Sequence, residues 1–127
     1  MKKFENFCSA LSNLEDIYKY EEPYDNVILT GLVSLYAICF EQAWKAMKEV
    51  LEDAGFAEER TGSPKSIIKT AYAARMIQEE DIWLSALICR NNVAHSYNKE
   101  IALDIIRKTK EQFVRMFQEL KKTMEQD

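Results

Sequence analysis

The sequence predicts an all-α domain: an antiparallel four-helix, up-and-down bundle with one additional short helix, formed by residues 1–127 as a single unit. The chain of 127 residues contains only 3 Gly and 2 Pro, too few turn-forming residues for many short strands. Its apolar residues recur at spacings of three and four, the period of an amphipathic helix. The breaks between these segments are short, and short connections join antiparallel neighbours in a bundle.

The first helix is predicted over about residues 2–20 and the second over residues 25–54. The first helix is indicated by four apolar side chains on one face: Phe4, Phe7, Leu11 and Leu14. Pro23 separates the two helices, because proline cannot continue the hydrogen-bond ladder. Gly55 is expected as a left-handed cap, with Phe56 packed back on the last turn. The second helix should be about 43 Å long and form the spine of the bundle.

The second helix is apolar almost all round over residues 27–40. A helix that is apolar on every side is expected to be buried on every side, so one of its neighbours would be a second subunit. Gly31 in this stretch predicts a close backbone approach. Trp44 and Trp83 lie in apolar stripes, and we expect both to be core anchors rather than base-stacking platforms.

Three further helices follow a polar loop. Ser63 is a predicted cap and Pro64 a favoured first helical residue. Acidic residues from Glu79 onward suit the positive N-terminus of the next helix. Asn98 is the predicted cap of the last helix, which we expect over residues 99–124.

The composition excludes several classes of protein. A single histidine, His95, leaves few ligands for a metal, and no cofactor is expected. Three separated cysteines (Cys8, Cys39 and Cys89) are expected to be buried free thiols of a reducing cytoplasm. The longest uncharged run, residues 26–40, falls short of the roughly 20 apolar residues that a membrane span requires, and no secretory signal is evident. We therefore expect a cytoplasmic protein that does not enter the membrane.

One stretch interrupts the apolar pattern: residues 89–98 are rich in polar and ionisable side chains between two apolar helices. His95 can give or take a proton near neutral pH. The planar guanidinium of Arg90 suits a phosphate group. Together they could cleave RNA without a metal: His95 would activate a ribose 2′-hydroxyl or protonate the leaving oxygen, while Arg90 holds the phosphate.

The spacing limits how these residues can meet. Arg90 and His95 are five positions apart, about 140° around an ideal helix, so they do not share a face. Asn91, four positions before His95, does share its face and could orient the imidazole. A site that uses Arg90 and His95 needs unwinding near Ala94 or convergence of segments from two subunits. The alternative is structural: His95 caps a helix end, Arg90 forms a surface ion pair and Tyr97 packs at the core rim.

The charge is unevenly distributed along the chain. Residues 1–63 carry 6 basic and 12 acidic side chains, whereas residues 64–127 carry 11 and 9. The net charge of -4 argues against broad, charge-driven RNA binding and favours a narrow local site.

The spacing Arg90-x4-His95-x-Tyr97, with Asn91 directly after the arginine, resembles the Arg-x4-His-x-Tyr signature of HEPN-domain proteins. Other features are similar to the branch called nucleotidyltransferase substrate-binding proteins: residues 40–45 (FEQAWK), Ser63, Pro64 and Trp83. The resemblance covers nearly the whole chain.

The resemblance implies a helical homodimer, with the site near the dimer interface, that binds a minimal nucleotidyltransferase encoded beside it. In toxin–antitoxin pairs of this kind, the HEPN subunit is a metal-independent endoribonuclease. The nucleotidyltransferase silences it by transferring AMP to the motif tyrosine. Carried over to this chain, Arg90 and His95 would be the catalytic pair, Asn91 a supporting polar residue and Tyr97 the AMP acceptor.

Two other functions remain open from the sequence. The chain could be a non-catalytic subunit that delivers a substrate to the nucleotidyltransferase. It could also be a structural helical dimer in which Arg90 and His95 only hold the interface.

Overall fold

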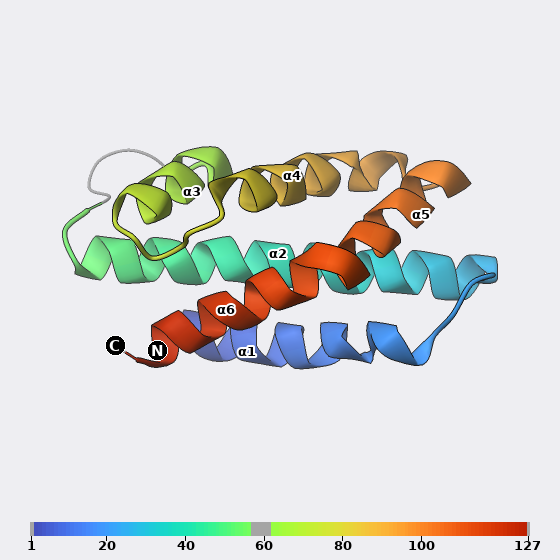
Figure 1. Cartoon of the computed structure of the whole chain (residues 1–127), viewed down its shortest axis with the longest axis horizontal. Coiled ribbons are helices and arrows are strands. Elements are labelled where there is room, and N and C mark those ends of the chain that lie inside the picture. Colours follow the sequence, from blue (N-terminus) through green and yellow to red (C-terminus); the bar gives the residue numbers. More distant parts are fainter. Residues whose placement is uncertain (1, 57–61, 127) are drawn as a thin grey trace.

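The computed structural model describes residues 2–56 and 62–126, and neither range contains a strand. The predicted all-α class is therefore confirmed, and the finer four-helix arrangement stays a prediction. Figure 1 shows α2 running the length of the molecule, with α1 along one side, α3 and α4 in succession along the other, and α5 and α6 crossing obliquely. The helices are α1 (Lys2–Leu14), α2 (Asn26–Asp53), α3 (Pro64–Ala73), α4 (Glu80–Asn91), α5 (Lys99–Lys108) and α6 (Val114–Glu125). Most of the predicted polar loop between α2 and α3 lies outside the described residues.

Local capping signals set several helix ends. The caps predicted at Ser63 and Asn98 are confirmed, and Asp25 caps α2 in the same way. Each side-chain oxygen accepts backbone N–H groups two or three residues on, at 2.9 to 3.2 Å. The left-handed cap predicted at Gly55 is also confirmed: its φ is 83°, and the N–H of Phe56 donates back to the last turn of α2 at 2.8 Å.

The first and last predicted helices differ from the observed ones. The first becomes a 3₁₀ helix over Glu15–Lys19 instead of remaining α-helical to its end. The last is divided by a π-helical turn, Thr109–Phe113, which the sequence analysis did not predict. Buried side chains follow one another here at intervals of four: Ile105, Thr109, Phe113 and Phe117. An interval of four exceeds the 3.6 residues of an α-turn, and a wider turn absorbs the excess.

Over residues 27–40, one stripe of α2 is exposed in the single chain, and its burial against a second subunit stays a prediction. Val27 is 79% exposed and Ile38 is 53% exposed. At helical spacing these two lie on one stripe with Gly31 and Ser34, both also exposed. A Cβ at Gly31 would meet no atom within 4 Å, so the described chain does not make the predicted close approach there.

Among the described helices, α2 is long and apolar enough to cross a membrane, with a mean hydropathy of 1.5 over an 18-residue window. A central core helix passes the same test. The buried side of α2 carries much of the hydrophobic core.

Aromatic rings from five segments meet on that buried side. The Tyr36 ring of α2 stacks on Phe113 of the π-helical turn, with ring centroids 5.4 Å apart. Trp83 of α4 meets Phe117 of α6 edge to face at 5.6 Å. Phe7 of α1 meets Phe117 at 6.2 Å. Trp83 is 2% exposed, so the prediction that it anchors the core is confirmed.

One buried polar contact crosses this apolar cluster. The Tyr36 hydroxyl donates to the main-chain oxygen of Ala86 in α4. Burial raises the pKa of Tyr36 well above its ordinary value. The neutral hydroxyl therefore ties α2 to α4 one helical turn before Arg90.

We expect Tyr36→Phe to lower the free energy of unfolding by about 1 kcal/mol at pH 7, because it removes this hydrogen bond and keeps the ring. Above about pH 10 the unfolded tyrosine ionises while the folded one keeps its proton, so the wild type loses stability as pH rises. The variant should lose less over that range. Urea unfolding at pH 7 and between pH 9 and 11 measures both effects.

Tyr20→Phe is the matched control, because Tyr20 is 41% exposed and its substitution should not change stability at pH 7. Equal losses above pH 10 in wild type and Tyr36→Phe would contradict the assignment.

Candidate functional site

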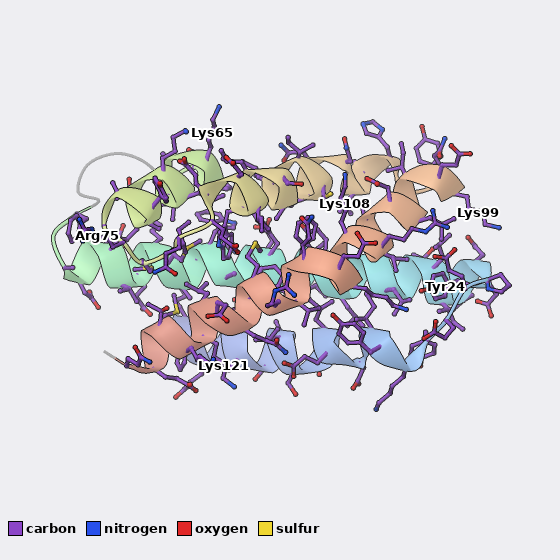
Figure 2. All side chains as sticks on the ribbon, in the orientation of Figure 1. Tyr24, Lys65, Arg75, Lys99, Lys108 and Lys121 are labelled. Atoms are coloured by element: carbon purple, nitrogen blue, oxygen red, sulfur yellow. The ribbon has the colours of Figure 1, made fainter. Side chains whose placement is uncertain are left out.

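The polar segment predicted to carry chemistry lies at one end of the molecule, where α4 ends and α5 begins. Figure 2 labels Lys99, the first residue of α5, at this end. The α-helix stops at Asn91 and the chain tightens into a 3₁₀ helix over Asn92–His95. The change of helix type falls where the sequence analysis required unwinding, near Ala94. Convergence with a second subunit stays a prediction.

Local hydrogen bonds hold the turn that follows. The Ser96 hydroxyl donates to the main-chain oxygen of Val93 at 2.7 Å, and the Ser96 N–H donates to the same atom at 3.0 Å. The N–H of Asn98 donates to the His95 oxygen at 3.0 Å. Because Asn98 also caps α5, residues 92–98 have a defined shape.

Arg90 points toward α2 and meets an acidic residue there. Its Nε lies 2.7 Å from Oε2 of Glu41, and its Nη1 donates to Oδ1 of Asn91 at 3.3 Å. The other oxygen of Glu41 accepts the indole N–H of Trp44 at 3.1 Å. The Asn91 side chain thus contacts the arginine. Trp44 is partly buried and packs against the hydrophobic core, as the prediction of a core anchor requires, although it is less buried than Trp83.

Glu41 is the residue that the sequence analysis missed as part of this site. It lies in residues 40–45, which contributed to the family resemblance, but the spacing along the chain does not reveal a contact between residues 41 and 90. Within one helix, only the pairing of Glu41 with Trp44, three positions apart, could have been expected.

His95 and Tyr97 project from the turn into solvent. His95 is exposed and Tyr97 is 86% exposed. Their rings meet edge to face with centroids 6.5 Å apart. Within the described part of the chain, no hydrogen bond or ion pair joins His95 to Arg90 or to Asn91. One chain therefore presents Arg90 against α2 and His95 beyond the end of α4.

Cys89, next to Arg90, is not suited to act as a nucleophile. It is buried, and burial raises the pKa of its thiol, which keeps the thiol protonated. Among residues 2–56 and 62–126, no three His, Cys, Asp or Glu side chains come together as metal ligands would.

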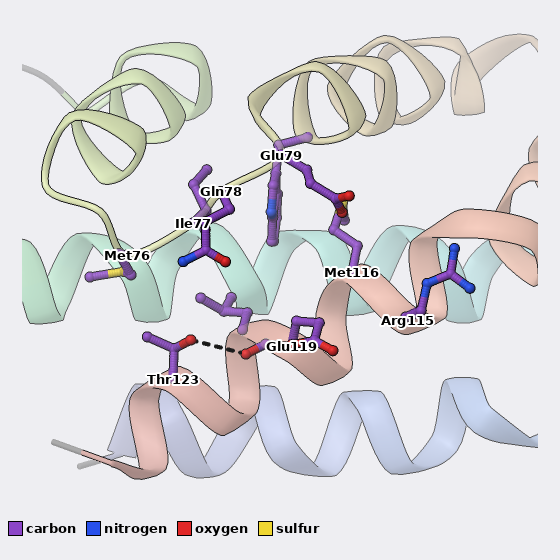
Figure 3. A pocket seen from close by; sticks show the side chains of 10 residues that line it. Met76, Ile77, Gln78, Glu79, Arg115, Met116, Glu119 and Thr123 are labelled. Carbon is purple, nitrogen blue, oxygen red and sulfur yellow. Dashed lines mark hydrogen bonds between the residues drawn. The ribbon is translucent and has the colours of Figure 1, made fainter.

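A cavity of about 260 Å³ lies elsewhere, between the α3–α4 connection and α6. Figure 3 shows Glu79, Arg115, Met116 and Glu119 around it. The Thr123 hydroxyl donates to the main-chain oxygen of Glu119 at 3.2 Å. The cavity adjoins the start of α4, whereas the polar segment follows its end. It contains none of the predicted site residues.

Comparison with known proteins agrees with the fold and with the resemblance. The structure superposes on a crystal structure of a protein from Thermus thermophilus with a TM-score of 0.79 and 22% identity, over 90% of this chain and 94% of that one. No curated protein matches the chain. The family model described as "nucleotidyltransferase substrate binding protein like" matches residues 2–126. The chain therefore belongs to this family of HEPN-like helical proteins.

Proposed function

We propose that this protein is the partner subunit of a minimal nucleotidyltransferase and that the enzyme acts on Tyr97. The family description supports the partnership. The observation that carries the choice of residue is the exposure of Tyr97, 86%, on a turn whose shape is fixed on both sides. A phenol presented in this way can enter the active site of another protein without unfolding its own chain.

The transfer is a displacement at phosphorus. The Tyr97 oxygen attacks the α-phosphorus of ATP, a phosphorus–oxygen bond forms, pyrophosphate leaves and the phenolic proton passes to a base. Tyr97 directly precedes Asn98, the cap of α5, so the modified side chain sits beside a helix N-terminus. The partial positive charge there, together with Lys99, favours the negative charge of the attached phosphate.

The unmodified protein is proposed to be a toxin-type endoribonuclease that needs no metal. His95 would take the proton of a ribose 2′-hydroxyl or protonate the 5′ oxygen that leaves. Arg90 would hold the phosphate, with Asn91 supporting it through the hydrogen bond at 3.3 Å. The 2′ oxygen attacks the adjacent phosphorus and the bond to the 5′ oxygen breaks, which leaves a 2′,3′-cyclic phosphate. AMP on Tyr97 would block this site, because the His95 and Tyr97 rings are neighbours.

A second candidate function is a non-catalytic subunit that presents a substrate to the nucleotidyltransferase. The family description favours it. A third hypothesis is purely structural. It predicts that Arg90→Ala and His95→Ala weaken dimerisation and have no effect on RNA or on nucleotide transfer.

Incubation with ATP and the nucleotidyltransferase encoded beside it should add one adenylate to the wild-type chain. Tyr97→Phe should gain none, because it lacks the attacking oxygen. Intact-protein and peptide mass spectrometry locate the adduct. Tyr72→Phe, which changes a tyrosine that is 47% exposed on α3, should be modified like the wild type. An adduct on another residue, or none, would refute the assignment of Tyr97.

RNA cleavage distinguishes the catalytic from the non-catalytic function. With a labelled single-stranded RNA in the presence of a chelator, the wild type should yield 2′,3′-cyclic phosphate ends. His95→Ala should lower the rate by at least about 10²-fold, the usual contribution of general acid–base catalysis. Lys65→Ala, which removes an exposed cation on α3, is the control for a change of charge. Equally poor cleavage by the wild type and His95→Ala would refute the ribonuclease and leave the non-catalytic and structural hypotheses.

A homodimer is part of the same proposal. The exposed stripe of α2 is apolar at Val27 and Ile38, and Gly31 between them has open space where a side chain would begin. A second copy packed on this stripe would bury these residues and explain why α2 is apolar on all sides. The dimer would then contain two copies of the polar segment, residues 89–98.

Light scattering of the wild type should give twice the mass of one chain. Ile38→Glu should raise the dissociation constant at least roughly tenfold, because it puts a charge into an apolar interface. Tyr72→Glu places the same charge on α3 and should leave the dimer intact. A monomeric wild type at working concentrations would refute the dimer.

A further inference from the structure

The Glu41 carboxylate is held at both of its oxygens. Oε2 lies 2.7 Å from Nε of Arg90, and Oε1 accepts the indole N–H of Trp44 at 3.1 Å. The side chains of Arg90 and Glu41 are 32% and 29% exposed, so the pair lies at the edge of the core. Trp44, Glu41 and Arg90 form one chain of contacts from α2 to the last turn of α4.

Each contact restricts the next side chain. Trp44 is partly buried, and its indole N–H has a fixed direction once the ring is packed. The N–H therefore orients the carboxylate of Glu41, three positions earlier on the same helix. The carboxylate in turn fixes Arg90, whose long side chain would otherwise sample many rotamers. The contacts of the guanidinium with Glu41 and Asn91 are thus formed without a ligand.

We propose that Glu41, held by Trp44, is a positioning residue that places the Arg90 guanidinium for a phosphate of RNA. The proposal rests on the ribonuclease chemistry proposed above. A guanidinium has five N–H donors. In Arg90, Nε makes the closest contact with Glu41 and one Nη1 hydrogen goes to Asn91. The remaining N–H groups of Nη1 and Nη2 can donate to phosphate oxygens.

The negative charge of Glu41 determines whether this residue affects kcat or the affinity for RNA. Because the carboxylate offsets the charge of Arg90, the pair attracts the singly charged diester of the ground state only weakly. In the transition state the non-bridging oxygens of the phosphoryl group carry more negative charge, and fixed donors act mainly on that charge. Glu41 therefore supports kcat and contributes little to substrate affinity. Removal of its charge frees the arginine to bind RNA at least as tightly, in a less productive position.

The test compares Glu41→Gln and Trp44→Phe with the wild type in steady-state RNA cleavage. Glu41→Gln should lower kcat about tenfold or more while KM stays equal or falls. Trp44→Phe keeps an aromatic ring and removes the N–H, so it should also lower kcat, by a smaller factor than Glu41→Gln. Glu52→Gln, the same change further along α2, is the control and should match the wild type. An unchanged kcat, or a raised KM alone, in Glu41→Gln would overturn the proposal.

A second measurement does not depend on cleavage. The NMR signal of the Arg90 Nε–H should be distinct in the wild type and should shift on addition of a 2′-O-methyl RNA strand, which cannot be cleaved. In Glu41→Gln and Trp44→Phe the signal should move toward that of a free arginine. The same Arg90 signal in the wild type and Glu41→Gln would overturn the positioning role. A wild type that binds the strand through Arg90 but cleaves no RNA would refute the ribonuclease and support the positioning role.

Discussion

The buried hydroxyl of Tyr36 is the contact on which the placement of α4 against α2 depends. Its ring packs against Phe113 while its oxygen bonds to the main chain of α4, so one side chain sets the distance between α2, α4 and the π-helical turn. An unpaired hydroxyl at this depth would be costly, and the donor therefore specifies one position of α4 along α2. Apolar packing alone, which lacks direction, would tolerate a shift of α4.

The position of α4 determines the position of the site. Ala86, which accepts the Tyr36 hydroxyl, lies four residues before Arg90, and four residues are about one turn. Arg90 therefore emerges on the side of α4 that faces Glu41. Beyond Arg90 the chain tightens into the 3₁₀ helix that carries His95 outward. A rigid core contact thus places a semi-exposed arginine and a solvent-exposed histidine.

Features encoded by adjacent residues could be predicted from the sequence, and features encoded by distant residues could not. The caps at Ser63, Asn98 and Gly55 need only a few neighbouring residues, and the structure confirms them. The π-helical turn accommodates buried side chains at intervals of four, and one of these positions is the polar Thr109, so the apolar pattern alone did not reveal it. The contact of Glu41 with Arg90 spans the chain between two helices. The motif was therefore visible in the sequence, but the partner of its arginine was not.

The uneven distribution of charge along the sequence is reflected in the ion pair of Glu41 and Arg90. Glu41 comes from the acidic first half and Arg90 from the slightly basic second half, and Glu22 pairs with Arg107 across the same division at 2.6 Å. Two basic residues of the second half, Arg90 and Arg107, are thus paired with acidic residues of the first half. A long polyanion gains most of its affinity from a broad cationic surface, and a chain with a net charge of -4 offers little such attraction. Recognition of RNA at this site would have to come from directed hydrogen bonds at one phosphate, which is what a guanidinium held in place by Glu41 can supply.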